Sequence, residues 1–416
     1  MCNWEQAWLT YELIENQKDK KYFESVYTQQ NGVLVESALR EIKTAAEKLF
    51  SITVRRGENR EEAGLILELN PALNLGKEGY QITEEEDRIY IRAAKENGLL
   101  YGTFRLLLMV SSGKEITGVS IREIPSNPVR MLNQWDNIDG SIERGYAGRS
   151  FFYENGKVCV TERIRDYARL LCSVGINGIS INNVNVRNGA EWLISERHYK
   201  ELEQISHIFA QYGISMYLCI DFAAPMTLGG LSCADPLKEE VKDWWEKKCG
   251  EIFGRLPNMG GFLVKADSEG RPGPFAYGRN HADGANMLAR AVKPYGGTII
   301  WRCFVYNCQQ DWRDRRTDRA CAGYDNFMPL DGKFDDNVIL QIKNGPIDFQ
   351  VREPVHPLFG GLQHTNQMLE VQIAQEYTGQ QIDVCYLVPM WKEVLDFSTG
   401  CGKPEDTVAD IISGRT

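Results

Sequence analysis

Short apolar runs alternate with amphipathic segments along most of the chain. Seven of these runs end in polar or charged residues, and they occupy residues 129–137, 175–184, 213–222, 260–269, 297–306, 337–346 and 369–378. Amphipathic helical patterns lie between them, for example at 161–174, 238–256 and 280–295. Apolar strands joined by helices are typical of a parallel sheet covered on both faces. We therefore predict a (β/α)8 barrel of the TIM type over residues 126–416.

A doubly wound open sheet is the structural alternative for the same pattern. Such sheets bind ligands at one switch point, and the nucleotide-binding ones carry a GxGxxG turn after the first strand. No GxGxxG follows any of the predicted strands, and charged residues end nearly all of them. The distribution of polar residues favours the barrel, whose sites lie at the carboxyl ends of all its strands.

The first 125 residues have a mixed pattern of helices and short strands. The sequence predicts helices at 36–50 and 97–112, and strands at 64–70, 80–85 and 88–94. No phosphate-binding loop occurs in this part. We predict a small α/β domain over residues 1–125, joined to the barrel by the stretch EIPSNPVR with its two prolines.

The barrel pattern ends one unit short of eight. After Glu376 come VCYLVPMWKEVLDF and a polar tail, which give no convincing eighth strand and helix. We therefore expect a barrel that is incomplete at its C-terminal end, with two open sheet edges.

Charge and composition exclude several classes of protein. The net charge is −10 and no basic stripe stands out, which disfavours a nucleic-acid-binding protein. No apolar run approaches membrane-spanning length, and the start shows no signal-peptide pattern, so we predict a cytoplasmic location. Eleven cysteines form no CxxC pair, and five histidines form no HxH or HExxH motif. The sequence therefore predicts no metal site and no cofactor.

Three carboxylates lie at or just past the predicted strand ends, on different barrel units: Glu269, Asp348 and Glu376. Three acids that face one cavity cannot all ionise comfortably, so one of them should keep its proton. One proton donor and two carboxylates able to activate water are the groups that glycoside hydrolysis uses. Serine nucleophile chemistry is less well supported, since no GxSxG occurs.

Three basic residues accompany these acids: Lys265, Arg302 and Lys343. A basic residue that points inward often pairs with a nearby acid. Three of them on successive strands also fit a pocket for an anionic group of a substrate, such as a carboxylate. Both interpretations remain open at the level of the sequence.

Several long motifs carry a family resemblance. They are RMLNQWDNIDGSIERGYAGRSFF (130–152), GINGISINNVN (175–185), VKADSEGRPGPFAYGRNHADGANMLA (264–289), NGPIDFQVREPVHPLFG (344–360) and QEYTGQ (375–380). Together they resemble family 67 glycoside hydrolases, the α-glucuronidases, along nearly the whole chain. The resemblance implies an inverting enzyme on a (β/α)8 barrel. Such enzymes release glucuronic acid, or its 4-O-methyl ether, from the 2-position of the terminal xylose of xylo-oligosaccharides.

The resemblance also assigns roles to the catalytic residues. Glu269 of KADSEG matches the family's general acid. Asp348 of GPIDFQ and Glu376 of QEYTG match the carboxylates that orient and activate the attacking water.

Five further residues match the family's substrate-binding positions. Lys265, Arg302 and Lys343 match the residues that hold the uronic-acid carboxylate and nearby hydroxyls. Trp135 matches a residue that packs on the sugar, and Val184 one that lines the 4-O-methyl pocket. Core packing is the alternative interpretation of Trp135 and Val184.

The expected partners are glucuronic-acid-substituted xylo-oligosaccharides, with no nucleic acid and no membrane. Family members also form homodimers through a helical C-terminal domain, before which this chain is expected to stop. One rival function is an inactive fragment that binds uronic acid sugars without turnover. Another is a hexosaminidase-like hydrolase, which would need an adjacent Asp-Glu pair that ends no strand here.

Overall fold

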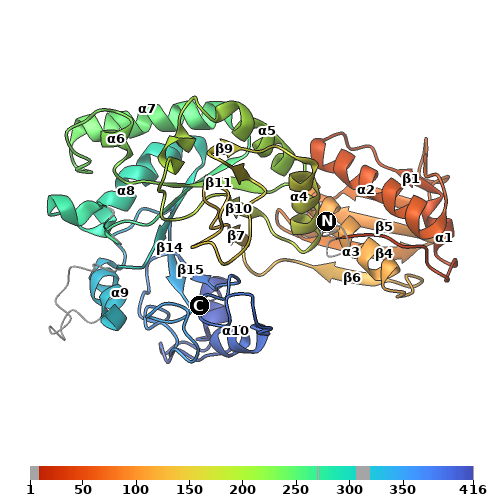
Figure 1. Cartoon of the computed structure of the whole chain (residues 1–416). Coiled ribbons are helices and arrows are strands. Elements are labelled where there is room, and N and C mark those ends of the chain that lie inside the picture. Colours follow the sequence, from red (N-terminus) through yellow and green to blue (C-terminus); the bar gives the residue numbers. More distant parts are fainter. Residues whose placement is uncertain (1–8, 269, 271, 306–318, 416) are drawn as a thin grey trace. The chain divides into compact units, whose positions relative to one another are not determined.

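A computed structural model describes residues 9–268, 270, 272–305 and 319–415 (Figure 1). The described residues divide into two compact units. The first unit contains the residues up to Arg130, together with Glu162–Asn177 and His207–Ile214. The second contains Met131–Thr161, Gly178–Ser206 and the residues from Ser215 onward.

The first unit contains a six-stranded sheet with the strand order β2-β1-β3-β5-β4-β6. Strand β4 is antiparallel to β5 and β6, and the other pairs are parallel. The strands are β1 (Ser25–Tyr27), β2 (Arg55–Arg56), β3 (Leu65–Leu69), β4 (Tyr80–Glu85), β5 (Arg88–Ala93) and β6 (Ser120–Glu123). The helices are α1 (Lys20–Phe23), α2 (Val33–Phe50), α3 (Glu96–Ser111) and α4 (Glu162–Ser173).

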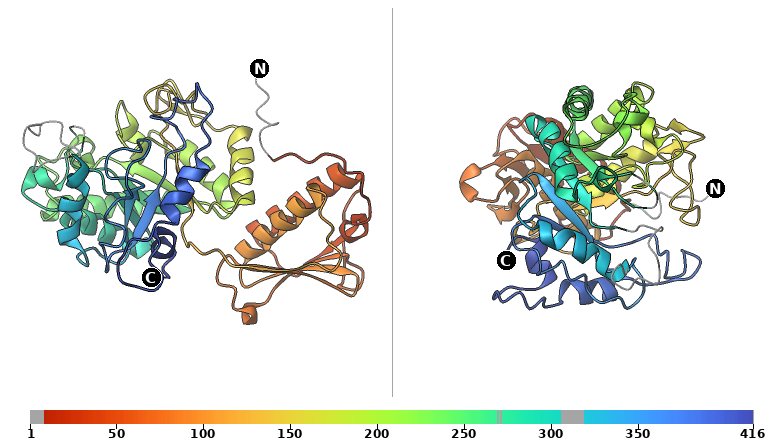
Figure 2. Two further views of the ribbon diagram at one scale, coloured as in Figure 1. Left: turned by 90° about the horizontal axis from the view of Figure 1, so that it is seen from below. Right: turned by 90° about the vertical axis from the view of Figure 1, so that its left-hand side faces the viewer.

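Helices α2 and α3 cover one face of this sheet (Figure 2). The alternation in β5 shows why one face is buried: Ile89, Ile91 and Ala93 are inside, while Arg88 and Arg92 stay partly exposed. Side chains of a strand point alternately to the two faces, so this pattern buries a single face. The two helices and three strands predicted for this part of the chain are confirmed.

The second unit contains a curled, parallel, seven-stranded sheet with the order β15-β14-β13-β12-β11-β10-β7 (Figure 1). All six neighbouring pairs are parallel. The strands are β7 (Met131–Asn133), β10 (Gly178–Ser180), β11 (Ser215–Ile220), β12 (Met259–Val264), β13 (Thr298–Arg302), β14 (Val338–Lys343) and β15 (Gln367–Glu370).

Helices connect most of these strands. The connecting helices include α6 (Ala224–Thr227), α7 (Glu239–Arg255), α8 (His281–Val292) and α9 (Arg319–Phe327), while α10 (Val388–Leu395) and α11 (Val408–Ile412) follow the last strand. Helix α5 (Tyr199–Ala210) runs from the second unit into the first, and β8 (Tyr153–Glu154) pairs with β9 (Lys157–Val158) as a hairpin. Across the described residues, no helix combines the length and the apolar character needed to cross a bilayer.

Each of the seven predicted strand ranges overlaps an observed strand, so the α/β fold with a parallel sheet is confirmed. The prediction was wrong about the end of the last strand. Strand β15 ends at Glu370, because its partner β14 ends at Lys343, the residue paired with Glu370. The segment from Val371 to Thr378 is therefore a loop, in which Gln375 has a φ of 61°.

Candidate active site

The three predicted basic residues lie together at the carboxyl ends of neighbouring strands. Lys265 follows β12 directly, and Arg302 and Lys343 are the last residues of β13 and β14. All three are buried, with exposed fractions of 5%, 3% and 3%. Parallel strands end at the same edge of a sheet, which explains why residues far apart in the sequence meet here.

The ring of Phe304 is the common neighbour of these three cations. Its centroid lies 3.5 Å from Lys343 Nζ, 5.3 Å from Lys265 Nζ and 5.5 Å from the guanidinium carbon of Arg302. Aromatic faces attract cations at such distances, and the attraction is larger in a buried site. Phe304 therefore helps the sheet to hold three positive groups side by side.

Arg302 and Lys343 are paired with acids, as the first interpretation anticipated. Arg302 Nε donates to Glu370 Oε2 at 2.8 Å, and Lys343 forms an ion pair with Asp348. Lys265 Nζ donates to Asn185 Oδ1 at 2.7 Å. Among the described residues, Arg302 Nη2 has no hydrogen-bond partner although it is buried. A buried guanidinium nitrogen without a partner is costly, and a carboxylate oxygen would satisfy it.

Lys343 is the most strongly perturbed base of the cluster. Burial, and then the positive charge of Arg302, lower the pKa of Lys343 to about 7. The ammonium group is thus close to giving up its proton at neutral pH, despite its ion pair with Asp348.

Asp348 is held rigidly in the loop that follows β14. Tyr377 donates its hydroxyl to Asp348 Oδ2 at 3.0 Å, while Lys343 contacts the other carboxylate oxygen. The backbone amides of Ile347 and Asp348 donate to Glu353 at 2.9 and 2.7 Å, so the loop itself is fastened. A carboxylate fixed in this way can hold a water molecule in one orientation.

Glu376 lies in the loop after β15. Its side chain is 10% exposed, and its Oε1 lies 3.7 Å from Nη1 of Arg144. Glu269 lies outside the described residues, so its role stays a prediction. Two residues before it, burial raises the pKa of Asp267 to about 6.

Trp135 joins the basic cluster from the segment just after β7. The guanidinium carbon of Arg302 lies 5.2 Å from its ring centroid, and the ring of Phe349 lies 6.4 Å away. Val184, on the loop after β10, is 3% exposed. Its neighbour Asn183 donates from Nδ2 to the carbonyl of Trp135 at 3.2 Å. Both residues are thus near the strand ends, and core packing stays the alternative interpretation for both.

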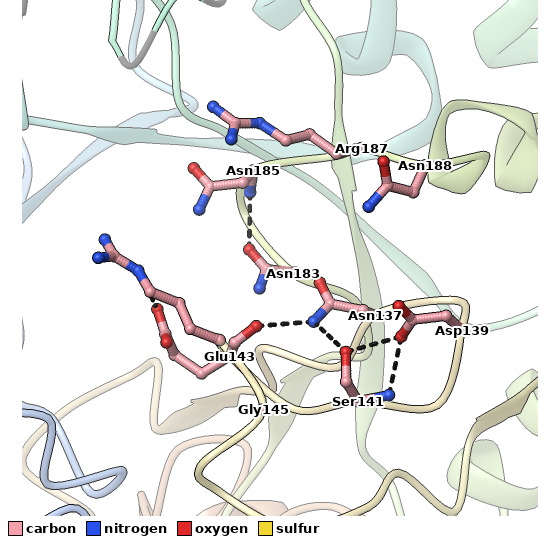
Figure 3. Close-up of a pocket in the computed structure, with 10 residues that line it drawn as sticks. Asn137, Asp139, Ser141, Glu143, Gly145, Asn183, Asn185, Arg187 and Asn188 are labelled. Carbon is pink, nitrogen blue, oxygen red and sulfur yellow. Dashed lines mark hydrogen bonds and ion pairs between the residues drawn. The ribbon is translucent and has the colours of Figure 1, made fainter.

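A cavity of about 670 Å³, lined mainly by polar residues, opens beside this cluster (Figure 3). Two loops line it, one after β7 and one after β10. Its lining residues are Asn137, Asp139, Ser141, Glu143, Arg144, Gly145, Asn183, Asn185, Arg187 and Asn188. Asn185 connects the cavity to Lys265, and Arg144 connects it to Glu376. Amide and carboxylate groups suit a ligand that carries many hydroxyl groups.

Sequence reasoning missed four residues that shape this site. They are Arg144, Asn185, Phe304 and Glu370. Glu370 had a signal, because an acid inside an apolar strand needs a buried partner. Arg144 had none, since its contact joins two loops at opposite edges of the strand order. In the part of the chain that the structure describes, no group of three or more His, Cys, Asp or Glu side chains is arranged to hold a metal ion.

Two family profiles together match almost the whole chain. The profile of the glycosyl hydrolase family 67 N-terminus matches residues 7–106, and that of the glycosyl hydrolase family 67 middle domain matches residues 109–416.

Curated proteins with similar sequences are named as α-glucuronidases. "Alpha-glucuronidase A" of Emericella nidulans is 40% identical over 441 residues, which is 98% of this chain and 51% of that protein. "Alpha-glucuronidase" of Hypocrea jecorina is 45% identical over 354 residues, 83% of this chain and 41% of that protein. The chain thus spans about half the length of the curated relatives it matches, or less.

Solved structures with a similar fold are much more distant in sequence. A mutant β-hexosaminidase of Streptomyces plicatus in complex with its product GlcNAc has a TM-score of 0.51 and 13% identity, covering 84% of this chain and 70% of that one. The GH20 β-N-acetylhexosaminidase from Streptomyces coelicolor has a TM-score of 0.50 and 13% identity, with 83% and 70% covered. At this identity the likeness concerns the fold alone.

Proposed function

Since the chain belongs to glycosyl hydrolase family 67, we propose that it carries the active site of an inverting α-glucuronidase. The bond cleaved is the α-1,2 bond between glucuronic acid, or its 4-O-methyl ether, and the terminal xylose of a xylo-oligosaccharide. The names of the relatives support the glucuronidase activity, and the finer substrate rests on the motifs given above.

The observation that carries the proposal is the buried basic cluster at the strand ends. Arg302 has one nitrogen paired with Glu370 and a second, Nη2, without a partner among the described residues. Lys265 and Lys343 lie against the same ring of Phe304. A uronic acid differs from a neutral sugar by its carboxylate, which this cluster would bind through charge-assisted hydrogen bonds.

Catalysis would proceed by a single displacement. Glu269 would protonate the glycosidic oxygen, while a water molecule held by Asp348 and Glu376 attacks the anomeric carbon from the opposite face. Inverting enzymes separate acid and base by roughly 6.5–9.5 Å to admit this water. The fixed carboxylate of Asp348, between Lys343 and the hydroxyl of Tyr377, supports its role in orienting the water.

The finer statement of the fold is also a proposal. The seven parallel strands form most of a (β/α)8 barrel, in which an eighth strand would pair with β15 on one side and β7 on the other. Among the described strands, β15 and β7 are the two edges of this sheet. The cytoplasmic location and the homodimer of the family stay predictions.

The substitution Glu269→Gln tests the proposal. It should abolish release of glucuronic acid from aldouronic acids but spare an aryl glucuronide, because a good leaving group needs little protonation. The control is Glu246→Gln, which alters an exposed residue of α7 and should leave both activities unchanged. Equal losses on both substrates would reject Glu269 as the acid. A parent chain that binds glucuronate but hydrolyses neither substrate would favour the inactive-fragment interpretation.

A further inference from the structure

One ion pair links loops from the two edges of the seven-stranded sheet. Arg144 lies in the loop after β7, and Glu376 lies in the loop after β15. These strands are the first and last in the sheet order, and no backbone pairing joins them among the described residues. The contact between Arg144 Nη1 and Glu376 Oε1, at 3.7 Å, nevertheless brings the two loops together.

The loop that carries Arg144 is fastened to the base of the site. The amide of Glu143 donates to the carbonyl of Trp135 at 2.8 Å, and Asn137 Nδ2 donates to the carbonyl of Glu143 at 2.8 Å (Figure 3). Glu143 also has a φ of 54°, a conformation that costs a non-glycine residue energy. Such a conformation persists only where the surrounding contacts impose it. The backbone of Arg144 therefore has little freedom.

The guanidinium of Arg144 lies beside two buried acids. Its Nε is 3.4 Å from Glu143 Oε1, and the side chains of Glu143 and Glu376 are 3% and 10% exposed. Arg144 itself is 63% exposed. Ion pairs on an open surface contribute little to stability. The carboxylates of Glu143 and Glu376 are largely buried, so solvent and salt screen their attraction to Arg144 much less. Arg144 thus places a positive charge between the carboxylates of Glu143 and Glu376.

We propose that Arg144 is a positioning residue that holds the carboxylate of Glu376 in the orientation needed to activate water. The inference rests on the proposed function, in which Glu376 acts on the attacking water. Arg144 acts through Glu376 and not through the substrate. Its loss should therefore lower kcat and leave KM nearly unchanged.

The test is steady-state kinetics of the full chain on an aldouronic acid, with three variants. Arg144→Gln removes the charge and should lower kcat about 10- to 100-fold, because a small misplacement of a catalytic group has effects of this size. Arg144→Lys keeps the charge and should recover most of this loss. Arg149→Gln, an exposed arginine of the same loop, is the matched control and should behave as the parent.

Each outcome decides between the possibilities. A kcat of Arg144→Gln equal to that of the parent would overturn the proposal while leaving the proposed function intact. A raised KM with an unchanged kcat would make Arg144 a substrate-binding residue and would overturn it as well. A parent chain without hydrolytic activity would overturn the proposed function and, with it, the role of Arg144. Thermal unfolding of each variant excludes a change in folding as the cause of a lower kcat.

Discussion

Arg169 in the first unit and Arg302 in the second are both largely buried, and each faces one glutamate. Arg169 donates from Nε to both carboxylate oxygens of Glu41 at 2.9 Å, and from Nη2 to Oε1 at 2.6 Å. Its Nη1 donates to the carbonyl of Leu9 at 2.5 Å, and Tyr11 adds a hydroxyl to the same glutamate at 2.7 Å. Arg302 donates to Glu370 through Nε at 2.8 Å, and its Nη2 has no partner among the described residues.

The difference separates a structural charge pair from one that can bind a ligand. A buried pair contributes to folding only when its remaining donors and acceptors are satisfied, as they are at Arg169. An unsatisfied donor in a buried site costs stability, and a ligand that accepts the hydrogen bond recovers this cost. Four substitutions test this distinction.

The largest effect is expected at Asp348. Asp348→Asn should lower kcat about 100- to 10,000-fold on every substrate, activated or not, because it removes a carboxylate that acts on water. The free energy of unfolding at pH 8 should change by at most about 1.5 kcal/mol. Burial and the charge of Arg302 lower the pKa of Lys343 to about 7, so this lysine can lose its proton when its partner is gone.

Kinetics and urea unfolding at pH 8 provide both quantities for Asp348→Asn. The control is Asp325→Asn on α9, an exposed position that should change neither of them. If Asp348→Asn instead lowered the free energy of unfolding by about 3–5 kcal/mol, the cost of breaking a buried pair, Asp348 would be a structural residue.

Glu41 should show the opposite behaviour. Glu41→Ala leaves Arg169 buried without its carboxylate, and breaking a buried pair costs about 3–5 kcal/mol of unfolding free energy. The kcat of the folded fraction should stay at the parent value. Urea unfolding beside the exposed Glu36→Ala of the same helix measures the difference. A loss below about 1 kcal/mol, the usual value of a surface pair, would show that the two arginines do not differ in this way.

Asp136, near the strand ends, is a buried acid whose Oδ1 has no hydrogen-bond partner among the described residues. Burial raises the pKa of Asp136 from 3.8 to about 6. The folded state therefore binds the proton more tightly than the unfolded state, and stability falls as the pH rises from about 4 to about 6, above which it levels off. Asp136→Asn removes the cost of the buried charge. The stability of the variant relative to the parent should therefore rise by about 1.5 kcal/mol between pH 5 and pH 8.

Urea unfolding at both pH values, beside the exposed Asp243→Asn on α7, measures this gain. A stability difference between variant and parent that does not change with pH would mean that the carboxyl of Asp136 titrates as it does in the unfolded chain.

The sequence was sufficient to predict the seven strands and the convergence of Lys265, Arg302 and Lys343. Apolar runs such as FLV before Lys265 mark buried parallel strands, and such strands end at one edge of their sheet. The local apolar pattern was therefore enough to predict that three residues far apart in the sequence meet in the fold.

The partners of these residues could not be predicted in the same way. Glu370 and Phe304 contact the basic residues through the register and curl of the sheet, which no local pattern encodes. The ion pair between Arg144 and Glu376 depends on two loops at opposite ends of the strand order. The end of β15 was also misplaced, because pairing with β14 and not the hydrophobic pattern decides where that strand stops.

The most direct test of the central claim, that the cluster around Arg302 recognises the carboxylate of a uronic acid, is calorimetric titration with glucuronate and with glucose. Arg302→Ala should lower the affinity for glucuronate about 10- to 100-fold, since a charge-assisted hydrogen bond contributes about 1.5–3 kcal/mol. Weak glucose binding should stay unchanged. Arg302→Lys keeps a positive charge beside Glu370, so it serves as a second variant if Arg302→Ala does not fold. Arg290→Ala, on the surface of α8, is the matched control. Equal affinities of the parent and both Arg302 variants for glucuronate would contradict the claim.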